Sequence, residues 1–129
     1  MFRSQAVSPG RQVWGLVGDG AFVVSMQYLV TAVRYKLPIK LIIFNKQELG
    51  FVKMEMEEAG LAMSQEALHL QNPNFLAYAK ACGADRGRLE EAKDIPIEIK
   101  MAIASPLPFI IDAVVSPGAL TLPPYITLN

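Results

Sequence analysis

The chain has 129 residues, of which 52% are hydrophobic and 19% are charged. This size and composition fit one globular domain with a hydrophobic core, so we expect residues 1–129 to form a single domain. Lys plus Arg and Asp plus Glu both number 12, and the resulting net charge of zero gives no electrostatic support for nucleic-acid binding.

The chain carries no sequence signal for export or for a membrane span. Lys36, Lys40 and Lys46 interrupt its most apolar region, and the first ten residues lack the apolar core of a secretory signal. We therefore expect a cytoplasmic protein. The chain begins almost directly on a predicted strand and ends on "LTLPPYITLN", so we expect a fragment of something larger.

The first elements are a strand and a helix. The short apolar, β-branched segment Gln12–Val17 predicts a buried strand, which ends at Gly18–Gly20. Apolar residues then recur every three or four positions, which predicts one helix that Leu37 and Pro38 end. The residues of this stripe are Phe22, Met26, Leu29, Val30 and Val33.

The middle of the chain alternates strand, loop and helix. Residues 39–44 predict a second buried strand, and the polar residues 45–50 predict a loop. Residues 51–60 predict a short helix, and residues 61–73 show no period and predict an irregular loop. Asn74 as N-cap and Gly83 as stop delimit another helix.

The last elements are a short strand at 87–89, a helix from Asp94 to about Ala104, and a strong strand at 108–115 followed by an extended tail. This order is typical of an α/β fold in which a mostly parallel sheet lies between helices, so we expect a three-layer unit. Ligands of such sheets bind at the carboxyl ends of the strands, where the loops 18–20 and 45–50 can share one site.

Asp19 stands between two glycines at a strand-to-helix junction. Glycines allow tight backbone angles, and the free amides of a helix start favour an anion such as phosphate. A carboxylate would repel a bare phosphate, but a divalent cation between the two removes that conflict. Asp19 therefore suggests a metal–diphosphate site, although Gly-Asp-Gly is also a common turn and Asp19 could be an N-cap only.

The pattern Gly18-Asp19-Gly20, then a helix, then a strand that ends at Asn45, resembles the GDG…NN motif of thiamine-diphosphate enzymes. The stretches "LVTAVRYKLPIKLIIFN", "ELGFVKMEMEEAG" and "PFIIDAVVS" resemble the C-terminal cofactor-binding domain of pyruvate oxidases, above all of quinone-dependent pyruvate dehydrogenases. The resemblance covers residues 8–129.

The resemblance implies a role for each matching position. Asp19 and the main-chain carbonyl of Glu48 would ligate Mg²⁺ or Ca²⁺, and the amides of Gly20 and Ala21 would bind the diphosphate of thiamine diphosphate. The resemblance also implies that three positions lie along the cofactor, namely Gly18, Leu49 and Gly50. It implies three candidate catalytic residues in the substrate pocket, namely Phe51, Val52 and Glu55.

Position 46 departs from the family, which has there the second asparagine of the Asn-Asn pair, the one that ligates the metal. An ammonium group has no lone pair while it is charged, so Lys46 cannot ligate a cation in that form. Three outcomes remain open: Lys46 turns away and water replaces it, Lys46 contacts the diphosphate directly, or the metal site is impaired. We expect weaker binding of Mg²⁺–thiamine diphosphate than in a Lys46→Asn variant.

The resemblance implies oxidative decarboxylation of pyruvate, with FAD as electron acceptor on a separate flavin domain. A pyrimidine domain of a partner subunit would complete the site, so we expect homo-oligomers and no activity of the chain alone. Membrane contact, at the inner face, would need a C-terminal extension beyond this chain. The alternatives are another thiamine-diphosphate enzyme, such as acetolactate synthase, or a non-catalytic oligomerisation module.

Three other features favour structural readings. His69, the one histidine, falls in the irregular loop without an acid or nucleophile beside it in a catalytic pattern. Cys82, the one cysteine, excludes an internal disulfide and is read as a buried thiol. Glu57 and Glu58 are read as a solvated helix face.

Overall fold

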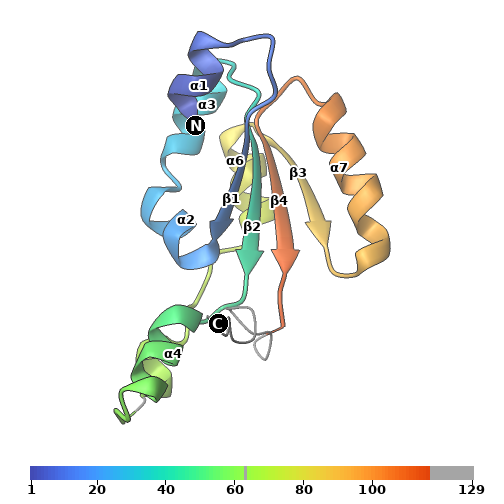
Figure 1. Ribbon diagram of the computed structural model, residues 1–129. Coiled ribbons are helices and arrows are strands. Elements are labelled where there is room, and N and C mark those ends of the chain that lie inside the picture. The colour runs from blue at the N-terminus through green and yellow to red at the C-terminus, as the bar shows by residue number, and fades with distance from the viewer. Residues whose placement is uncertain (63, 117–129) are drawn as a thin grey trace, which may run out of the picture.

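A computed structural model describes residues 1–62 and 64–116, and the predicted extended tail from 117 lies outside them. Figure 1 shows a parallel sheet of four strands in the order β1-β2-β4-β3. The predicted α/β fold is confirmed, and β3 begins two residues before the predicted short strand. The strands are β1 (Trp14–Gly18), β2 (Lys40–Asn45), β3 (Asp85–Leu89) and β4 (Phe109–Val114).

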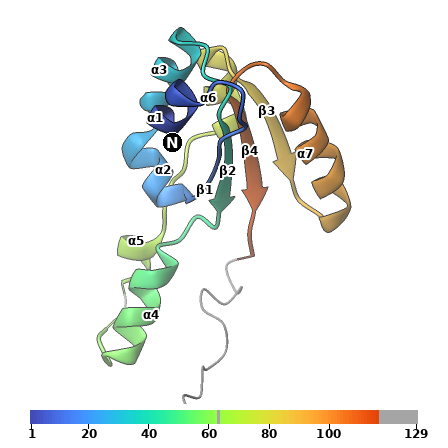
Figure 2. The same ribbon diagram turned by 45° about the horizontal axis from the view of Figure 1, so that its top comes forward.

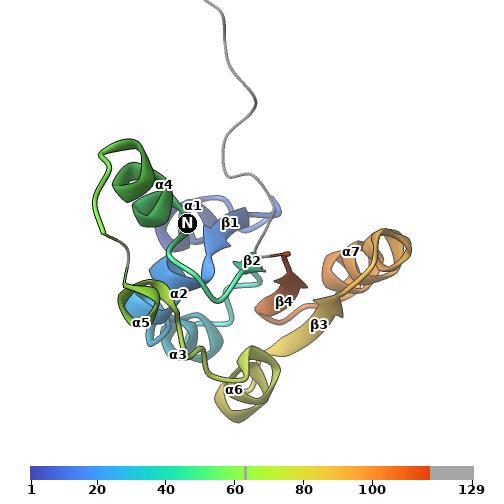
Figure 3. The same cartoon turned by 90° about the horizontal axis from the view of Figure 1, so that it is seen from below.

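Helices lie on both faces of the sheet. Seen from below, α2 (Asp19–Ser25), α3 (Tyr28–Arg34) and α6 (Phe75–Cys82) cover one face, and α7 (Ile95–Ala104) covers the other beside β3 and β4 (Figure 3). The prediction of three layers is therefore confirmed. The remaining helices are α1 (Phe2–Val7), α4 (Gly50–Glu58), α5 (Gln65–Leu68) and the 3₁₀ turn η1 (Ala92–Asp94).

Each face of the sheet has its own core because side chains alternate along a strand. Leu41 and Ile43 of β2 pack with Phe22 of α2 and Phe75 of α6, whose rings meet edge to face at 5.4 Å between centroids. Ile42 points the other way and packs against a smaller cluster that α7 covers. This apolar burial fixes the sheet, and thereby the loops at its carboxyl edge.

The single helix predicted after Gly20 is two helices, so that prediction is wrong in one respect. The carbonyl of Met26 accepts a hydrogen bond from the Tyr78 hydroxyl and another from Leu29 N at 3.0 Å. Both contacts take this carbonyl out of the regular helical pattern. As a result α2 ends at Ser25 and α3 begins at Tyr28.

The region predicted as an irregular loop contains order. It includes the short helix α5, and His69 forms an isolated antiparallel bridge with Glu48. The helix α1 at the start of the chain was also not predicted. Figure 2 shows α4 and α5 projecting together beyond the carboxyl ends of the strands. Within the described residues, no helix is long and apolar enough to cross a membrane.

The predicted helix boundaries at Asn74 and Gly83 are confirmed. Asn74 accepts a hydrogen bond from Ala77 N at 2.9 Å, and Gly83 has a φ of 84°. Such caps end a helix without leaving unpaired amides or strained side chains. Asn74 and Gly83 therefore delimit α6 as the sequence predicts.

Candidate functional site

Two predicted loops meet at the carboxyl edge of the sheet. Gly18 pairs with Phe44 in the parallel register of β1 and β2, so both strands end at the same level. The junction 18–20 and the loop 45–50 therefore lie side by side, as the sequence predicts. Both loops contribute to one cavity of about 550 Å³.

Asp19 is the central acid of this site and only 4% of its surface is exposed. Its Oδ2 accepts hydrogen bonds from the main-chain N–H groups of Lys46 at 3.1 Å and Gln47 at 2.6 Å, and from the side chain of Asn72 at 2.7 Å. Its Oδ1 accepts one, from Gly20 N at 2.9 Å. The carboxylate is thus held with one oxygen saturated and the other able to accept a further partner.

Gln47 shows how tightly the loop 45–50 follows Asp19. Its φ of 58° lies in the left-handed region, which is costly for a residue with a side chain. This backbone turn accompanies the short hydrogen bond from Gln47 N to Asp19. The bond to the carboxylate offsets the cost of the turn.

Gly20 lets two loops approach α2. A Cβ atom there would lie 3.2 Å from Leu49 Cδ2 and 3.3 Å from Leu70 Cδ1, which is tighter than ordinary contact. Its small size is therefore used for packing the loop 45–50 and the segment 69–74 against the start of α2.

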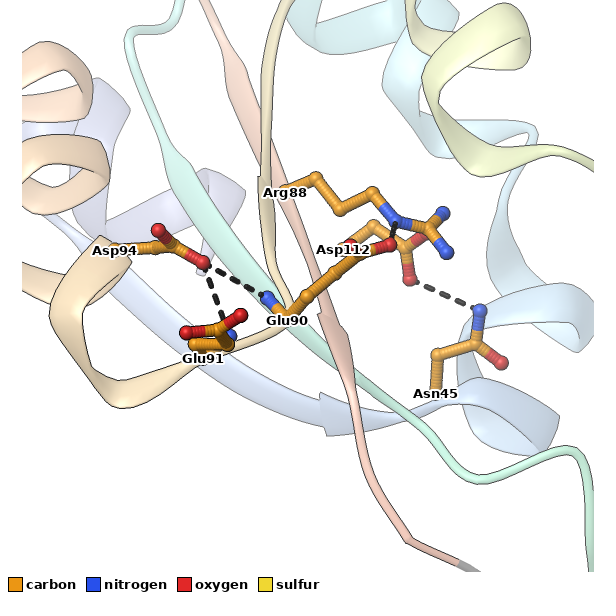
Figure 4. Close-up of polar contacts among 6 residues, drawn as sticks. All are labelled: Asn45, Arg88, Glu90, Glu91, Asp94 and Asp112. Atoms are coloured by element: carbon orange, nitrogen blue, oxygen red, sulfur yellow. Dashed lines mark hydrogen bonds and ion pairs between the residues drawn. The ribbon is translucent and has the colours of Figure 1, made fainter.

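Asn72 is a site residue that sequence reasoning missed, because it falls in a stretch without periodicity. Its Nδ2 donates to Asp19 Oδ2 and, at 3.0 Å, to Asn45 Oδ1. Asn45 in turn donates to Asp112 Oδ1 at 2.9 Å, and Arg88 forms an ion pair with Asp112 Oδ2 at 3.0 Å (Figure 4). This chain of polar contacts ties Asp19 to β2, β4 and β3.

Glu48 has two roles in the geometry. Its main-chain carbonyl, the predicted metal ligand, accepts a hydrogen bond from Gly50 N at 2.9 Å, and a carbonyl oxygen keeps a second lone pair. Its side chain pairs with Lys53 Nζ at 2.8 Å, and this hydrogen bond raises the pKa of Lys53. The other carboxylate oxygen, Oε2, is buried and has no hydrogen-bond partner within the described residues.

The structure brings almost all predicted site residues to the cavity. Glu55 is the exception, since it lies on the exposed surface of α4 and is not among the lining residues. Phe51 and Val52 line the cavity from α4 and remain 55% and 42% exposed. The predicted residues that line it are Gly18, Asp19, Gly20, Ala21, Lys46, Glu48, Leu49, Gly50, Phe51 and Val52.

Residues 4–113 match the family described as "Thiamine pyrophosphate enzyme, C-terminal TPP binding domain", and the chain belongs to this family. Its fold is that of a thiamine-diphosphate-binding domain. The predicted assignment to this class is confirmed, whereas the finer assignment to pyruvate oxidases is not settled by the comparisons.

Relatives with different names match most of the chain. The Bacillus subtilis protein YdaP, provisionally named as containing thiamine pyrophosphate, is 34% identical over 118 residues, covering 88% of this chain and 20% of its own length. Acetolactate synthase 2 of Nicotiana tabacum is 29% identical over 123 residues, covering 89% and 18%.

A solved structure shares the fold. The thiamine diphosphate-dependent 4-hydroxybenzoylformate decarboxylase of Rhodococcus jostii RHA1 superposes with a TM-score of 0.81 at 27% identity, over 88% of this chain and 21% of that one. The chain thus spans about a fifth of the length of the relatives it matches.

Two of the cavity's positions fit the cation that would accompany a bound diphosphate, and a third does not. Asp19 Oδ1 and the Glu48 carbonyl are hard oxygen donors of the kind that Mg²⁺ prefers. Gly20 keeps side-chain atoms away from the start of α2, where the anion would lie. Lys46, which also lines the cavity, is a cation at the position where the resemblance implies a second side-chain ligand.

Proposed function

We propose that this chain is the diphosphate-binding part of an enzyme that oxidatively decarboxylates pyruvate, to acetate or acetyl phosphate, and passes the electrons to FAD. The supporting observation is that the stretch "ELGFVKMEME", which resembles pyruvate oxidases, supplies the wall of the cavity beside Asp19 through Phe51 and Val52. Thiamine diphosphate supplies the electron sink for cleaving the bond to the carboxyl carbon.

The chain's own residues would bind and orient the cofactor. Asp19 Oδ1 and the Glu48 carbonyl would hold the cation, and the main-chain N–H groups of Gly20 and Ala21 would donate to the diphosphate. Leu49 and Gly50 would lie along it. Phe51 and Val52 would exclude water from the reacting end, which strengthens electrostatic interactions there.

Glu55 can contribute to the substrate pocket only if a second subunit packs against α4. It is exposed on α4, and the helix projects beyond the sheet with much of its surface uncovered. We propose that a pyrimidine domain of a second subunit packs against α4 and brings Glu55 to the edge of the substrate pocket. The half-exposed side chains of Phe51 and Val52 support such a homo-oligomeric contact.

The flavin domain, a cytoplasmic location and any membrane contact at the inner face through a C-terminal extension belong to the same proposal. They rest on the resemblance to pyruvate oxidases. The experiment is to express the full-length protein that contains this chain and to assay pyruvate-dependent reduction of an artificial electron-accepting dye. Dye reduction that requires pyruvate and thiamine diphosphate supports the proposal, and a protein without bound flavin overturns it.

A second candidate function is acetolactate synthesis. It is favoured by the tobacco relative, which is named for that activity and aligns with 89% of this chain. The same full-length preparation distinguishes the two candidates. Formation of acetolactate from pyruvate without dye reduction would favour the synthase.

A further inference from the structure

The cavity beside Asp19 has an apolar wall that comes from the sheet itself. Phe44 of β2 and Val115, which follows β4, line the cavity, and neither residue has a role in the proposed function. We propose that these two side chains bind the organic part of the ligand, an aromatic and cationic ring joined to the diphosphate. The cavity would then select an organic diphosphate over inorganic diphosphate. This inference rests on the proposed function, to which it adds a basis for ligand selection.

Phe44 lies between two small neighbours at the carboxyl edge of the sheet. In the parallel register it pairs with Gly18 of β1 and with Ala113 of β4. Paired residues point to the same face of a sheet, so the ring is flanked by one residue without a side chain and one with only a methyl group. Phe44 is accordingly 44% exposed. Its ring therefore has free surface for a ligand at the level where Asp19 begins α2.

The space beside the ring is open above Gly18. A Cβ atom there would meet no atom within 4 Å beyond its neighbours in the chain, whereas a Cβ atom at Gly20 would lie 3.2 Å from Leu49 Cδ2. The backbone of Gly18, with φ −73° and ψ 153°, is in the extended region that other residues also adopt. A side chain at position 18 is thus compatible with the backbone and would occupy the space next to Phe44.

Val115 continues the apolar wall beyond the end of β4. Its main-chain N donates to the carbonyl of Asn45 at 3.0 Å, so the chain still runs beside β2 at this point. Side chains alternate along a strand, which puts Val115 on the same face as Ala113 and Phe44. Helix α7, which covers this face, lies beside β3 and β4 (Figure 3). Val115 is partly buried and borders the cavity.

The two parts of the cavity differ in what they can bind. Asp19 and the Glu48 carbonyl offer oxygens to a cation, whereas the side chains of Phe44 and Val115 have no hydrogen-bonding group. Inorganic diphosphate has no apolar surface to bury against them. An organic ring does, and a cationic ring is also attracted to the face of a phenyl group. The cavity of about 550 Å³ lies within the ~300–1,000 Å³ of sites that bind whole organic ligands.

The test measures, by calorimetry with Mg²⁺, the affinity of the 129-residue chain for thiamine diphosphate and for inorganic diphosphate. Phe44→Ala removes the ring, and Gly18→Val fills the space beside it without removing a side chain. Leu16→Ala is the matched control. Leu16 lies two residues before Gly18 in β1, is 69% exposed and is not among the residues that line this cavity.

We expect Phe44→Ala and Gly18→Val to bind thiamine diphosphate at least about tenfold more weakly than wild type, and inorganic diphosphate within about twofold of it. Leu16→Ala should match wild type for both ligands. An equal loss for the two ligands, or no loss for either, would overturn the inference and leave the proposed function standing. Gly18→Val decides between these results if Phe44→Ala does not fold. Absence of thiamine diphosphate binding to wild type would overturn both.

Discussion

Asn72 donates a hydrogen bond to Asp19 across 53 positions of sequence, at 2.7 Å between Nδ2 and Oδ2. It is the one side-chain donor to this carboxylate within the described residues, since the other donors are main-chain N–H groups. Asn72 therefore couples the segment after His69 to the candidate cation ligand. Groups that orient a ligand in this way affect metal affinity without touching the metal.

The substitution Asn72→Ala tests this coupling. We expect the affinity for Mg²⁺, measured by titration at saturating thiamine diphosphate, to fall by about tenfold or more. Asn74→Ala is the control, because it removes only the cap of α6 at Ala77. That control should cost about 1 kcal/mol of stability and leave Mg²⁺ affinity unchanged. Wild-type affinity in Asn72→Ala would show that the main-chain donors suffice.

The ion pair of Arg88 on β3 with Asp112 on β4 extends the chain of polar contacts that begins at Asp19. The Asp112 side chain is 3% exposed, and that of Arg88 is 44% exposed. Arg88→Met leaves a buried carboxylate short of a donor, and we expect a loss of about 1–3 kcal/mol in urea unfolding. Glu90→Gln, which weakens only the exposed ion pair of the same arginine, should change stability by less than about 0.5 kcal/mol. Equal effects of both substitutions would contradict this reading.

Lys40 is a buried lysine at the opposite end of β2 from the cavity. Its Nζ donates to the carbonyls of Ser105 at 2.7 Å and Leu107 at 2.8 Å. Burial lowers the pKa of Lys40, and the charge of Asp85 opposes this shift. Between the folded pKa and 10.5 the unfolded chain binds more protons, so stability should rise with pH in that window.

Lys40→Met should abolish this rise in stability while it destabilises the chain at neutral pH, because two carbonyls lose their donor. The measurement is the midpoint of urea unfolding at several pH values up to about 10. A rise of the same size in Lys40→Met would show that other groups cause it.

The Tyr78 hydroxyl donates to the Met26 carbonyl between α2 and α3, and its ionisation makes the stability of the fold depend on pH in the alkaline range. Burial, together with a hydrogen bond to Cys82, raises its pKa to about 12. Because the folded pKa exceeds the ordinary value of 10, the stabilising contribution is complete below pH 10 and is lost as pH rises toward 12. Absorbance titration at the tyrosinate band should show one group that ionises late and is absent in Tyr78→Phe. No difference between the two titrations would refute the assignment.

The sequence patterns that succeeded were local ones. The apolar runs of β1, β2 and β4 and the caps at Asn74 and Gly83 predicted elements that the structure contains. The junction at Asp19 was predictable because glycines at a strand end allow the tight backbone angles that a turn needs.

The features that were missed depend on contacts between distant segments. Asn72 gains its role only when the segment after His69 packs over Asp19, and the break between α2 and α3 accompanies the hydrogen bond from Tyr78 to the Met26 carbonyl. The left-handed turn at Gln47 has no signal in sequence, since a glycine would be expected there. Tertiary hydrogen bonds decide all three positions.

The central claim, that the cavity beside Asp19 binds thiamine diphosphate, is tested most directly by blocking the cavity. Ala21 lines it from α2, whereas Val24 lies on the same helix, is 82% exposed and is not among the lining residues. Binding of thiamine diphosphate with Mg²⁺ is measured by calorimetry on wild type, Ala21→Trp and Val24→Trp. We predict that wild type and Val24→Trp bind alike and that Ala21→Trp loses at least about tenfold in affinity. Equal binding by all three, or no binding by wild type, would contradict the claim.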